Sequence, residues 1–571
     1  MLNSRTLIQV SVAKVCMLGA FLFSGVVEAQ NTSISDLADI GAWRLLKTSW
    51  SPEDETGYSN FVRAIGKSGC RTVDSCVRSP ANPYRATDPT PEQYTFWSDC
   101  ADWPYFLRSY YAWKNGLPMV FSQGMVPLPL NDEQKNLILQ GKTKEQPDVR
   151  YSRNGNFPSR RVRLPDARTG VTNFFRSHQS IQDTVHTATF RVDPRTNLGD
   201  MYSPAVQRGA IRPGTAVYDP AGHVGVVYDV TADGQVMVFD ALIDRKSISP
   251  RRPYSLDVYK RSKIEHGGWF QNFRPVVIEN AQYDSRVGSY VGGQPRLLTN
   301  AEIPEFSIEM FGNTQAADGK KAYLLQNNEV TSLFQEFLRR QMFQGKYSIN
   351  ILTEFRLSLK AVCDDFAVRL GMVQEPTTKG IASQPHMPVL PDTIFGGHGD
   401  LDLFSTPGSD LRRRAAVEAS IALAKELKNQ VDRRNPEFSY QGSDAKADLI
   451  SVAQQSLNSC SVSYKNSAGR PISLNLESLI KRMPLMSFSP WHCVELRWGA
   501  TSSQELATCA DINDPVKMRW YKAQQSLRNQ KVRDTNIFTG YSLEELEKRS
   551  AELGPVQPEN FNFIQRLQSE L

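Results

Sequence analysis

The chain has 571 residues, more than one hydrophobic core usually organises, so we expect two or three domains. Hydrophobic residues make up 40% of it and charged residues 22%, a balance that excludes a disordered or fibrous chain. The net charge of +6 is small for this length and gives no indication of nucleic-acid binding.

The first 29 residues have the pattern of an export signal. The basic residues Arg5 and Lys14 precede an apolar run over 15–27. The small residue Ala29 fits a cleavage site. The apolar run is shorter than the roughly 20 residues that a membrane span needs. We therefore expect cleavage before Gln30, a secreted or periplasmic protein, and no transmembrane segment after cleavage.

Exported proteins tend to oxidise their thiols in pairs, and the number of cysteines after the signal is odd. They are Cys70, Cys76, Cys100, Cys363, Cys460, Cys493 and Cys509. Cys70 and Cys76 are close enough to form a small loop, and the last four can pair among themselves in three ways. This leaves Cys100 as the free thiol; in the alternative, Cys100 pairs with Cys70 or Cys76.

In chain order, the first predicted element is a short helix over 35–48. A second helix is indicated by apolar side chains from Trp103 to Trp113 that recur every three or four residues. It begins near Cys100, because Pro104 is tolerated only in the first turn of a helix, and Gly116 ends it.

The next stretch, about 119–207, is irregular, and we interpret it as an insertion. Within 141–180, nine lysines and arginines stand against three acids, an excess that equals the net charge of the whole chain. Such a segment would hold an anionic polymer against a neighbouring site, with a solvated loop as the alternative.

After residue 213 the pattern changes to short runs of β-branched residues separated by turn residues. The predicted strands are 215–218, 223–230, 235–242 and 274–278. Beyond residue 283, helical periodicity dominates. The predicted helices are 329–370 with a break near Gly345, 409–434, 516–533 and 542–553, the last with Ser542 and Glu545 as a capping box.

Cys100 and His223 have the residue types and positions of a thiol nucleophile and its base. A helix start lowers the pKa of a thiol and offers N–H donors to an oxyanion. An imidazole at the head of a strand takes the thiol proton and returns it to a leaving amine.

A third side chain must fix the tautomer of the histidine. If 231–234 is a four-residue hairpin loop, Gly225 faces Asp240, and Asp240 shares a face of the sheet with His223. Asp244 lies diagonally on the other side of His223 and is the competing candidate.

Other candidates are weaker. His178 and His186 are alternative bases, and Tyr94 is a candidate oxyanion donor. The segment 397–402 contains a histidine and two aspartates in a Gly-rich turn, which suits a metal, although a plain loop is the more economical interpretation. We expect no metal or other cofactor.

Four short segments resemble those of the NlpC-type cell-wall peptidases, a branch of the papain-like fold related to the CHAP amidases. They are Asp99-Cys100-Ala101-Asp102, Arg212-Pro213-Gly214-Thr215-Ala216-Val217-Tyr218, His223-Val224-Gly225-Val226-Val227-Tyr228 and Val238-Phe239-Asp240-Ala241. The resemblance implies that Cys100 is the nucleophile, His223 the general base and acid, and Asp240 the orienting residue. The interval of 123 residues from Cys100 to His223 is longer than is typical of the family.

The resemblance also implies an α+β fold in which the helix that bears the cysteine packs on a small antiparallel sheet. We expect a signal peptide at 1–29, a papain-like domain at 30–283 with the basic insertion, and a mostly helical domain at 284–571. The expected function is cleavage of an amide bond in peptidoglycan peptides, with that polymer as the partner. The alternatives are a non-catalytic cell-envelope binding or scaffold protein and a thiol acyltransferase.

Overall fold

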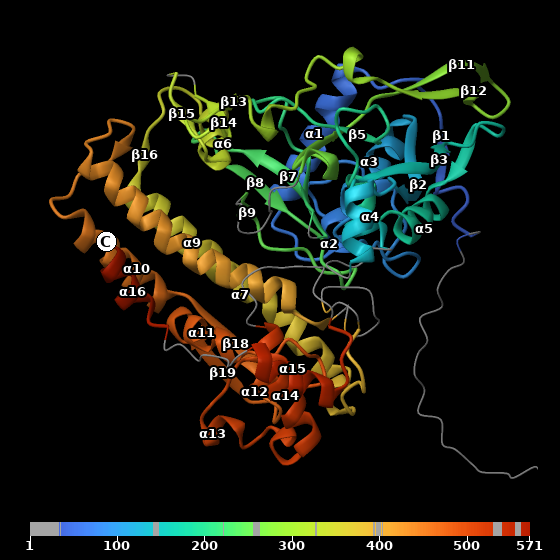
Figure 1. The fold of residues 1–571 in the computed structure, drawn as a ribbon. Helices are drawn as coiled ribbons and strands as arrows, with labels where there is room; N and C mark the ends of the chain where they lie inside the picture. Colours follow the sequence, from blue (N-terminus) through green and yellow to red (C-terminus); the bar gives the residue numbers. More distant parts are fainter. Residues whose placement is uncertain are drawn as a thin grey trace, which may run out of the picture.

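The computed structural model describes residues 34, 36–140, 148–220, 222–254, 263–325, 328–391, 394, 401, 404–528, 539–553 and 561–571. The predicted signal peptide and, apart from Leu401, the candidate metal segment at 397–402 lie outside the described residues. The fold is mixed α+β, as the sequence predicts, and two lobes are visible in Figure 1.

A six-stranded antiparallel sheet forms the centre of the first lobe, in the order β5-β10-β6-β7-β8-β9. The strands are β5 (Met201–Tyr202), β6 (Ala216–Asp219), β7 (His223–Val230), β8 (Val236–Phe239), β9 (Arg252–Pro253) and β10 (Phe270–Phe273). β6, β7 and β8 confirm three of the predicted strands. β9 is the last strand at one edge of this sheet.

Helix α3 (Asp102–Asn115) packs against this sheet and is buried from its first residue to Trp113. Gly116 ends it with a φ of 63°, the left-handed conformation that favours glycine. This confirms the predicted helix. Around α3 lie α1 (Pro52–Lys67), α2 (Val73–Val77) and α5 (Phe174–Thr184).

The predicted helix over 35–48 is wrong. Residues 42–44 form strand β1 (Ala42–Arg44), which pairs with β4 (Val171–Asn173). The side chains of Trp43 and Leu45 are fully buried, whereas Arg44 and Leu46 are exposed, which is the alternation of a strand with one buried face.

The described residues of the stretch 119–207, which are 119–140 and 148–207, are folded rather than irregular. β2 (Met119–Pro127) and β3 (Asn156–Leu164) form an antiparallel pair, and helix α4 (Asp132–Leu139) lies between them in the chain. Several of its arginines already have partners: Arg161 pairs with Asp200, and Arg163 donates to the carbonyl groups of Gly292 and Gly293.

The first lobe continues beyond the predicted boundary at residue 283. The hairpin β11 (Val276–Asp284) and β12 (Ser289–Leu297) is followed by a three-stranded sheet and by helix α6 (Phe334–Met342). The three strands are β13 (Thr314–Gln315), β14 (Lys321–Leu324) and β15 (Val330–Thr331). One apolar cluster joins α6 to β6, β7 and β8, so this segment packs on the central sheet.

The second lobe is mostly helical and has its own apolar core. Its two long helices, α7 (Ile351–Thr378) and α9 (Pro407–Asp432), lie side by side (Figure 1). The other elements are β16 (Ile349–Asn350), β17 (Phe438–Ser439), α10 (Ala445–Ser459), β18 (Ser461–Lys465), β19 (Pro471–Asn475), α11 (Leu476–Arg482), α12 (Val494–Arg497), α13 (Ser503–Leu506), α14 (Pro515–Arg528), α15 (Leu543–Leu553) and α16 (Phe563–Glu570).

The predicted helices of this half are present with shifted ends. The predicted break near Gly345 separates α6 from α7. Ser542 and Glu545 form the predicted capping box, because each accepts a hydrogen bond from the backbone N–H group of the other. Among the helices that the structure describes, none has the length and apolar character that crossing a bilayer requires.

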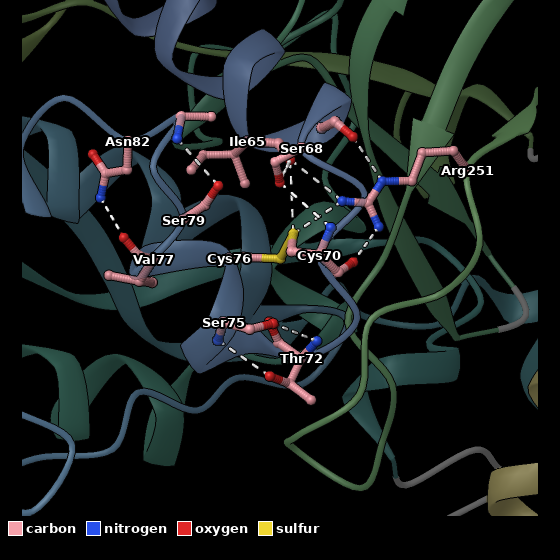
Figure 2. Close-up of a disulfide and its surroundings, with 12 residues drawn as sticks. Ile65, Ser68, Cys70, Thr72, Ser75, Cys76, Val77, Ser79, Asn82 and Arg251 are labelled. Atoms are coloured by element: carbon pink, nitrogen blue, oxygen red, sulfur yellow. Dashed lines mark hydrogen bonds between the residues drawn. A yellow bond between two sulfur atoms is a disulfide. The ribbon is translucent and has the colours of Figure 1, made fainter.

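Three disulfides join Cys70 to Cys76 (Figure 2), Cys363 to Cys460 and Cys493 to Cys509. Cys100 is the free cysteine among the described residues. The predicted Cys70–Cys76 bond is confirmed, as is pairing of the last four cysteines among themselves in one of the three possible ways, and the alternative in which Cys100 pairs with Cys70 or Cys76 is wrong. The three bonds are compatible with an oxidising compartment.

Replacing both Cys363 and Cys460 by serine is expected to destabilise the second lobe by about 2–5 kcal/mol. This bond joins α7 to the end of α10 across 97 residues, so its loss releases a long loop in the unfolded chain. The Cys70–Cys76 bond spans six residues, so the same double replacement there is the matched control with a smaller expected loss. Denaturant unfolding of both variants checks this, and a larger loss in the control would contradict it.

Candidate active site

Cys100 lies in the turn that leads into α3, and the residue as a whole is partly exposed. The carboxylate of Asp99 accepts hydrogen bonds from the backbone N–H groups of Ala101, at 2.8 Å, and Asp102, at 3.2 Å. The Asp99 carboxylate therefore binds the N–H groups at the start of the helix, a place that the sequence predicts for the sulfur.

His223 and Asp240 are hydrogen bonded. Nε2 of His223 lies 3.0 Å from Oδ2 of Asp240, and both side chains are buried. The other oxygen of Asp240, Oδ1, accepts from Oγ of Ser249 at 2.8 Å and from Nη2 of Arg252 at 2.9 Å. Each oxygen of the carboxylate thus has its own partners, which fixes the rotation of the Asp240 side chain.

Asp244, the competing third residue, has a different role. Its Oδ1 accepts the backbone N–H groups of Lys246 and Ser247, so it closes the turn after β8. The residue that the structure places against His223 is Asp240.

The register between β7 and β8 explains this placement. The loop between them has five residues rather than the predicted four, because Val230 pairs with Val236. An irregularity between Val227 and Asp229 then shifts the register by one residue, and Val226 pairs with Phe239. Continuing that register places Asp240 opposite Gly225, which is the predicted pairing.

The thiol of Cys100 lies beside the same strand. It interacts with the backbone N–H group of Val224, the residue after His223, and it is within electrostatic reach of Asp240. The structure therefore places Cys100 near the start of β7 and the end of β8, where His223 and Asp240 are joined by a hydrogen bond.

The charges around the sulfur oppose its ionisation. Burial raises the pKa of the Cys100 thiol, and the carboxylates of Asp99, Asp240 and Asp102 act in the same direction, against the N–H group of Val224. The expectation that the helix start lowers this pKa is wrong, because burial of the thiol raises the pKa and the Asp99 carboxylate at that helix end adds to the effect.

The pKa values of His223 and Asp240 are both lowered, whereas that of the Cys100 thiol is raised. Burial lowers the pKa of His223, and the positive charges of Arg412 and Arg252 add to the effect, against Asp240. Burial acts to raise the pKa of Asp240, but Arg252 and His223 outweigh it and hold that pKa well below its usual range. At neutral pH the site therefore holds a neutral thiol, a neutral imidazole and an ionised carboxylate.

Asp99→Asn is expected to speed alkylation of Cys100 by iodoacetamide at pH 7 by about tenfold, because removing a neighbouring charge shifts a pKa by roughly one unit. An asparagine oxygen can still cap the helix. Asp102→Asn is the matched control with a smaller expected effect, because Asp102 contributes less than Asp99 to the raised pKa of the Cys100 thiol. Equal rates for wild type and Asp99→Asn would contradict the electrostatic account.

Two weaker candidates have structural roles. Nε2 of His178 donates to the carbonyl of Trp97 at 2.8 Å, and its Nδ1 accepts the hydroxyl of Tyr94 at 2.6 Å. His178 is therefore not a base for Cys100, and Tyr94 is not an oxyanion donor. Burial and the charge of Arg150 lower the pKa of His186, against the carboxylates of Asp148 and Asp99.

Sequence reasoning missed Ser249, Arg252 and Arg412. Arg252 follows Arg251 after β8, and Arg412 belongs to a run of three arginines near the start of α9. Basic runs are common on solvated surfaces, so these two gave no specific signal.

One described group has the spacing of a metal-ligand set, namely Cys493, Cys509 and Asp511. Both of its sulfur atoms are joined in a disulfide, and Asp511 accepts the N–H group of Cys493 and pairs with Lys517. This set therefore does not fit a metal ion.

The geometry of Cys100, His223 and Asp240 is what supports a function for this protein. Comparisons of the chain with protein-family models, with curated proteins and with solved structures each found no match.

Proposed function

We propose that this protein is an exported thiol hydrolase that cleaves an amide bond through Cys100, His223 and Asp240. The observation that supports this most strongly is the 3.0 Å hydrogen bond between His223 and Asp240 beside a thiol left out of the disulfides. A thiol, an imidazole and a carboxylate in this order form the constellation of a nucleophile, its base and an orienting group.

The ionised Asp240 carboxylate can only accept a hydrogen bond, so the ring nitrogen that faces it, Nε2 of His223, carries the hydrogen and Nδ1 is the basic nitrogen. Nδ1 removes the thiol proton as the sulfur attacks the carbonyl carbon of the substrate. Since thiol and imidazole are both neutral at rest, proton transfer accompanies the attack. The imidazolium then gives the proton to the leaving amine, and a thioester remains on Cys100.

Water completes the reaction. The neutral imidazole takes a proton from a water molecule, whose oxygen attacks the thioester carbon, and the thiol leaves with the proton returned. The negative oxygen formed in each attack needs a hydrogen-bond donor. The backbone N–H group of Cys100 is adjacent to the sulfur, and no acceptor for it is present among the described residues.

The proposed substrate is the peptide part of peptidoglycan. The export signal and the resemblance to NlpC-type peptidases support this choice, as does the basic segment. Four arginines of that segment are exposed, namely Arg160, Arg161, Arg168 and Arg176, and those other than Arg161, which pairs with Asp200, are placed to contact an anionic polymer.

The test is digestion of purified wall fragments with the full chain, before and after alkylation of Cys100, with released peptides read by mass spectrometry. We expect release that stops once Cys100 is alkylated. An unchanged rate after complete alkylation would exclude the thiol as nucleophile. An added amine that appears in the products in place of water would identify an acyltransferase.

A non-catalytic cell-envelope binding protein is the second candidate function. The raised pKa of the Cys100 thiol favours it, because an unactivated thiol is a poor nucleophile. Sedimentation with wall fragments, without any release of peptide, would support this candidate over the hydrolase.

A further inference from the structure

A row of charged side chains leads from the proposed site into the helical lobe. It begins at Arg252 of β9, whose Nη2 lies 2.9 Å from Oδ1 of Asp240 and whose Nη1 lies 3.2 Å from Oδ1 of Asp365. Asp365 belongs to α7, in the second lobe. One guanidinium therefore bridges the carboxylate that holds His223 and a carboxylate of the other lobe.

The row continues within the second lobe. Nε of Arg413, on α9, lies 3.7 Å from Asp365, and its Nη1 lies 2.8 Å from Asp410. Asp410 also pairs with Arg369 of α7 at 2.7 Å. Arg369 and Arg413 are almost completely buried. Buried charges persist only with partners, so these contacts fix where α7 presents Asp365.

The first lobe holds Arg252 from the other side, through its neighbour. Arg251 donates to the backbone carbonyls of Gly66, at 2.8 Å, and Cys70, at 2.6 Å, and its Nη2 reaches Sγ of Cys70 at 3.0 Å. Figure 2 shows this guanidinium beside the Cys70–Cys76 disulfide. Arg251 thus anchors the start of β9 while Arg252 extends toward Asp240.

We propose that Arg252 is a positioning residue for the His223–Asp240 pair and that Asp365 holds Arg252 in place, so the helical lobe is part of the active centre. This inference rests on the proposed function of the site. Arg252 acts through Asp240: by binding Oδ1 it leaves Oδ2 directed at Nε2 of His223.

The charged groups that face this pair come from several elements. Arg252 and Arg251 approach Asp240 from β9 and the residue before it, and Cys100 approaches from the turn before α3. Arg412 approaches His223 from α9. Arg252 carries a positive charge and its partner Asp365 a negative one. Removing the charge of Arg252 and removing that of Asp365 should therefore shift the pKa of His223 in opposite directions, which can be tested.

The test follows His223 by NMR of histidine-labelled full chain, in Arg252→Gln, Arg252→Lys and Asp365→Asn. Removing the positive charge in Arg252→Gln is expected to raise the pKa of His223 by about 0.5 unit or more. Asp365→Asn removes one of the two carboxylates that pair with Arg252, so less negative charge offsets the guanidinium and the pKa of His223 is expected to fall. Arg252→Lys keeps the charge and is expected to restore the wild-type titration.

Asp364→Asn is the matched control, because this neighbour on α7 pairs with Lys360 outside the row. The acid limb of peptide release should move with each NMR titration. Shifts in the same direction for Arg252→Gln and Asp365→Asn, or a shift in Asp364→Asn that equals the Asp365→Asn shift, would overturn the inference. If Arg252→Gln does not fold, the inference is tested by comparing the titration of His223 in Asp365→Asn with that in Asp364→Asn. Opposed NMR shifts without any peptide release would uphold the row and refute the proposed function.

Discussion

Cys100→Ala is expected to lower peptide release from wall fragments by at least about 10³-fold, the loss typical when the nucleophile of a triad is removed. The reason is that the thioester cannot form without the sulfur. Among the described residues no other free thiol is present to replace it, because the remaining six cysteines are joined in disulfides. Initial rates of release by mass spectrometry measure the effect.

His223→Gln is the companion variant, which tests the base in place of the nucleophile. It leaves the thiol in place and removes the base, so it is expected to cause a comparable loss. Thermal unfolding of both variants shows whether the fold is retained. Release by Cys100→Ala at more than about a tenth of the wild-type rate would contradict the nucleophile assignment.

Asp240→Asn is expected to lower the rate of release by about 10²-fold or more, because an amide no longer selects the Nε2–H tautomer of His223. The substitution also leaves Arg252 without one of its two carboxylate partners, so the variant is expected to be less stable. Since the folded-state pKa of Asp240 is lowered, its contribution to stability is present above pH ~4 and is lost as the pH falls below that value.

Asp244→Asn is the matched control on the same turn. Asparagine can still accept the N–H groups of Lys246 and Ser247, so rates and stability are expected to stay close to those of the wild type. Equal losses in the two variants would show that the turn, and not the orientation of His223, explains the effect of Asp240→Asn.

Local pattern was sufficient for the parts of the site that lie on regular elements. The apolar spacing from Trp103 to Trp113 and the left-handed glycine at 116 predicted α3, and the run from His223 predicted β7. The pairing of Asp240 with Gly225 was also predicted, although the loop length was wrong. The irregularity near Tyr228 compensates for the longer loop, and a period-two pattern does not reveal two such offsets that cancel.

Contacts between distant segments were not predictable in the same way. Arg252 and Asp365 are 113 residues apart, and their ion pair depends on how α7 packs against the edge of the sheet. The prediction that the helix start lowers the pKa of the Cys100 thiol was wrong for a related reason. The sequence shows Asp99 beside Cys100, but only the fold shows that its carboxylate caps α3 and raises the pKa of the thiol.

The central claim is that the sulfur of Cys100 forms a covalent bond to the substrate. The most direct measurement is acid quenching of the wild-type chain during turnover of wall fragments, followed by peptide mapping by mass spectrometry. The account predicts an acyl group on the peptide that contains Cys100, removed by hydroxylamine and absent from Cys100→Ala. Peptide release with an unmodified Cys100 at every time point, and at an equal rate in Cys100→Ala, would contradict it.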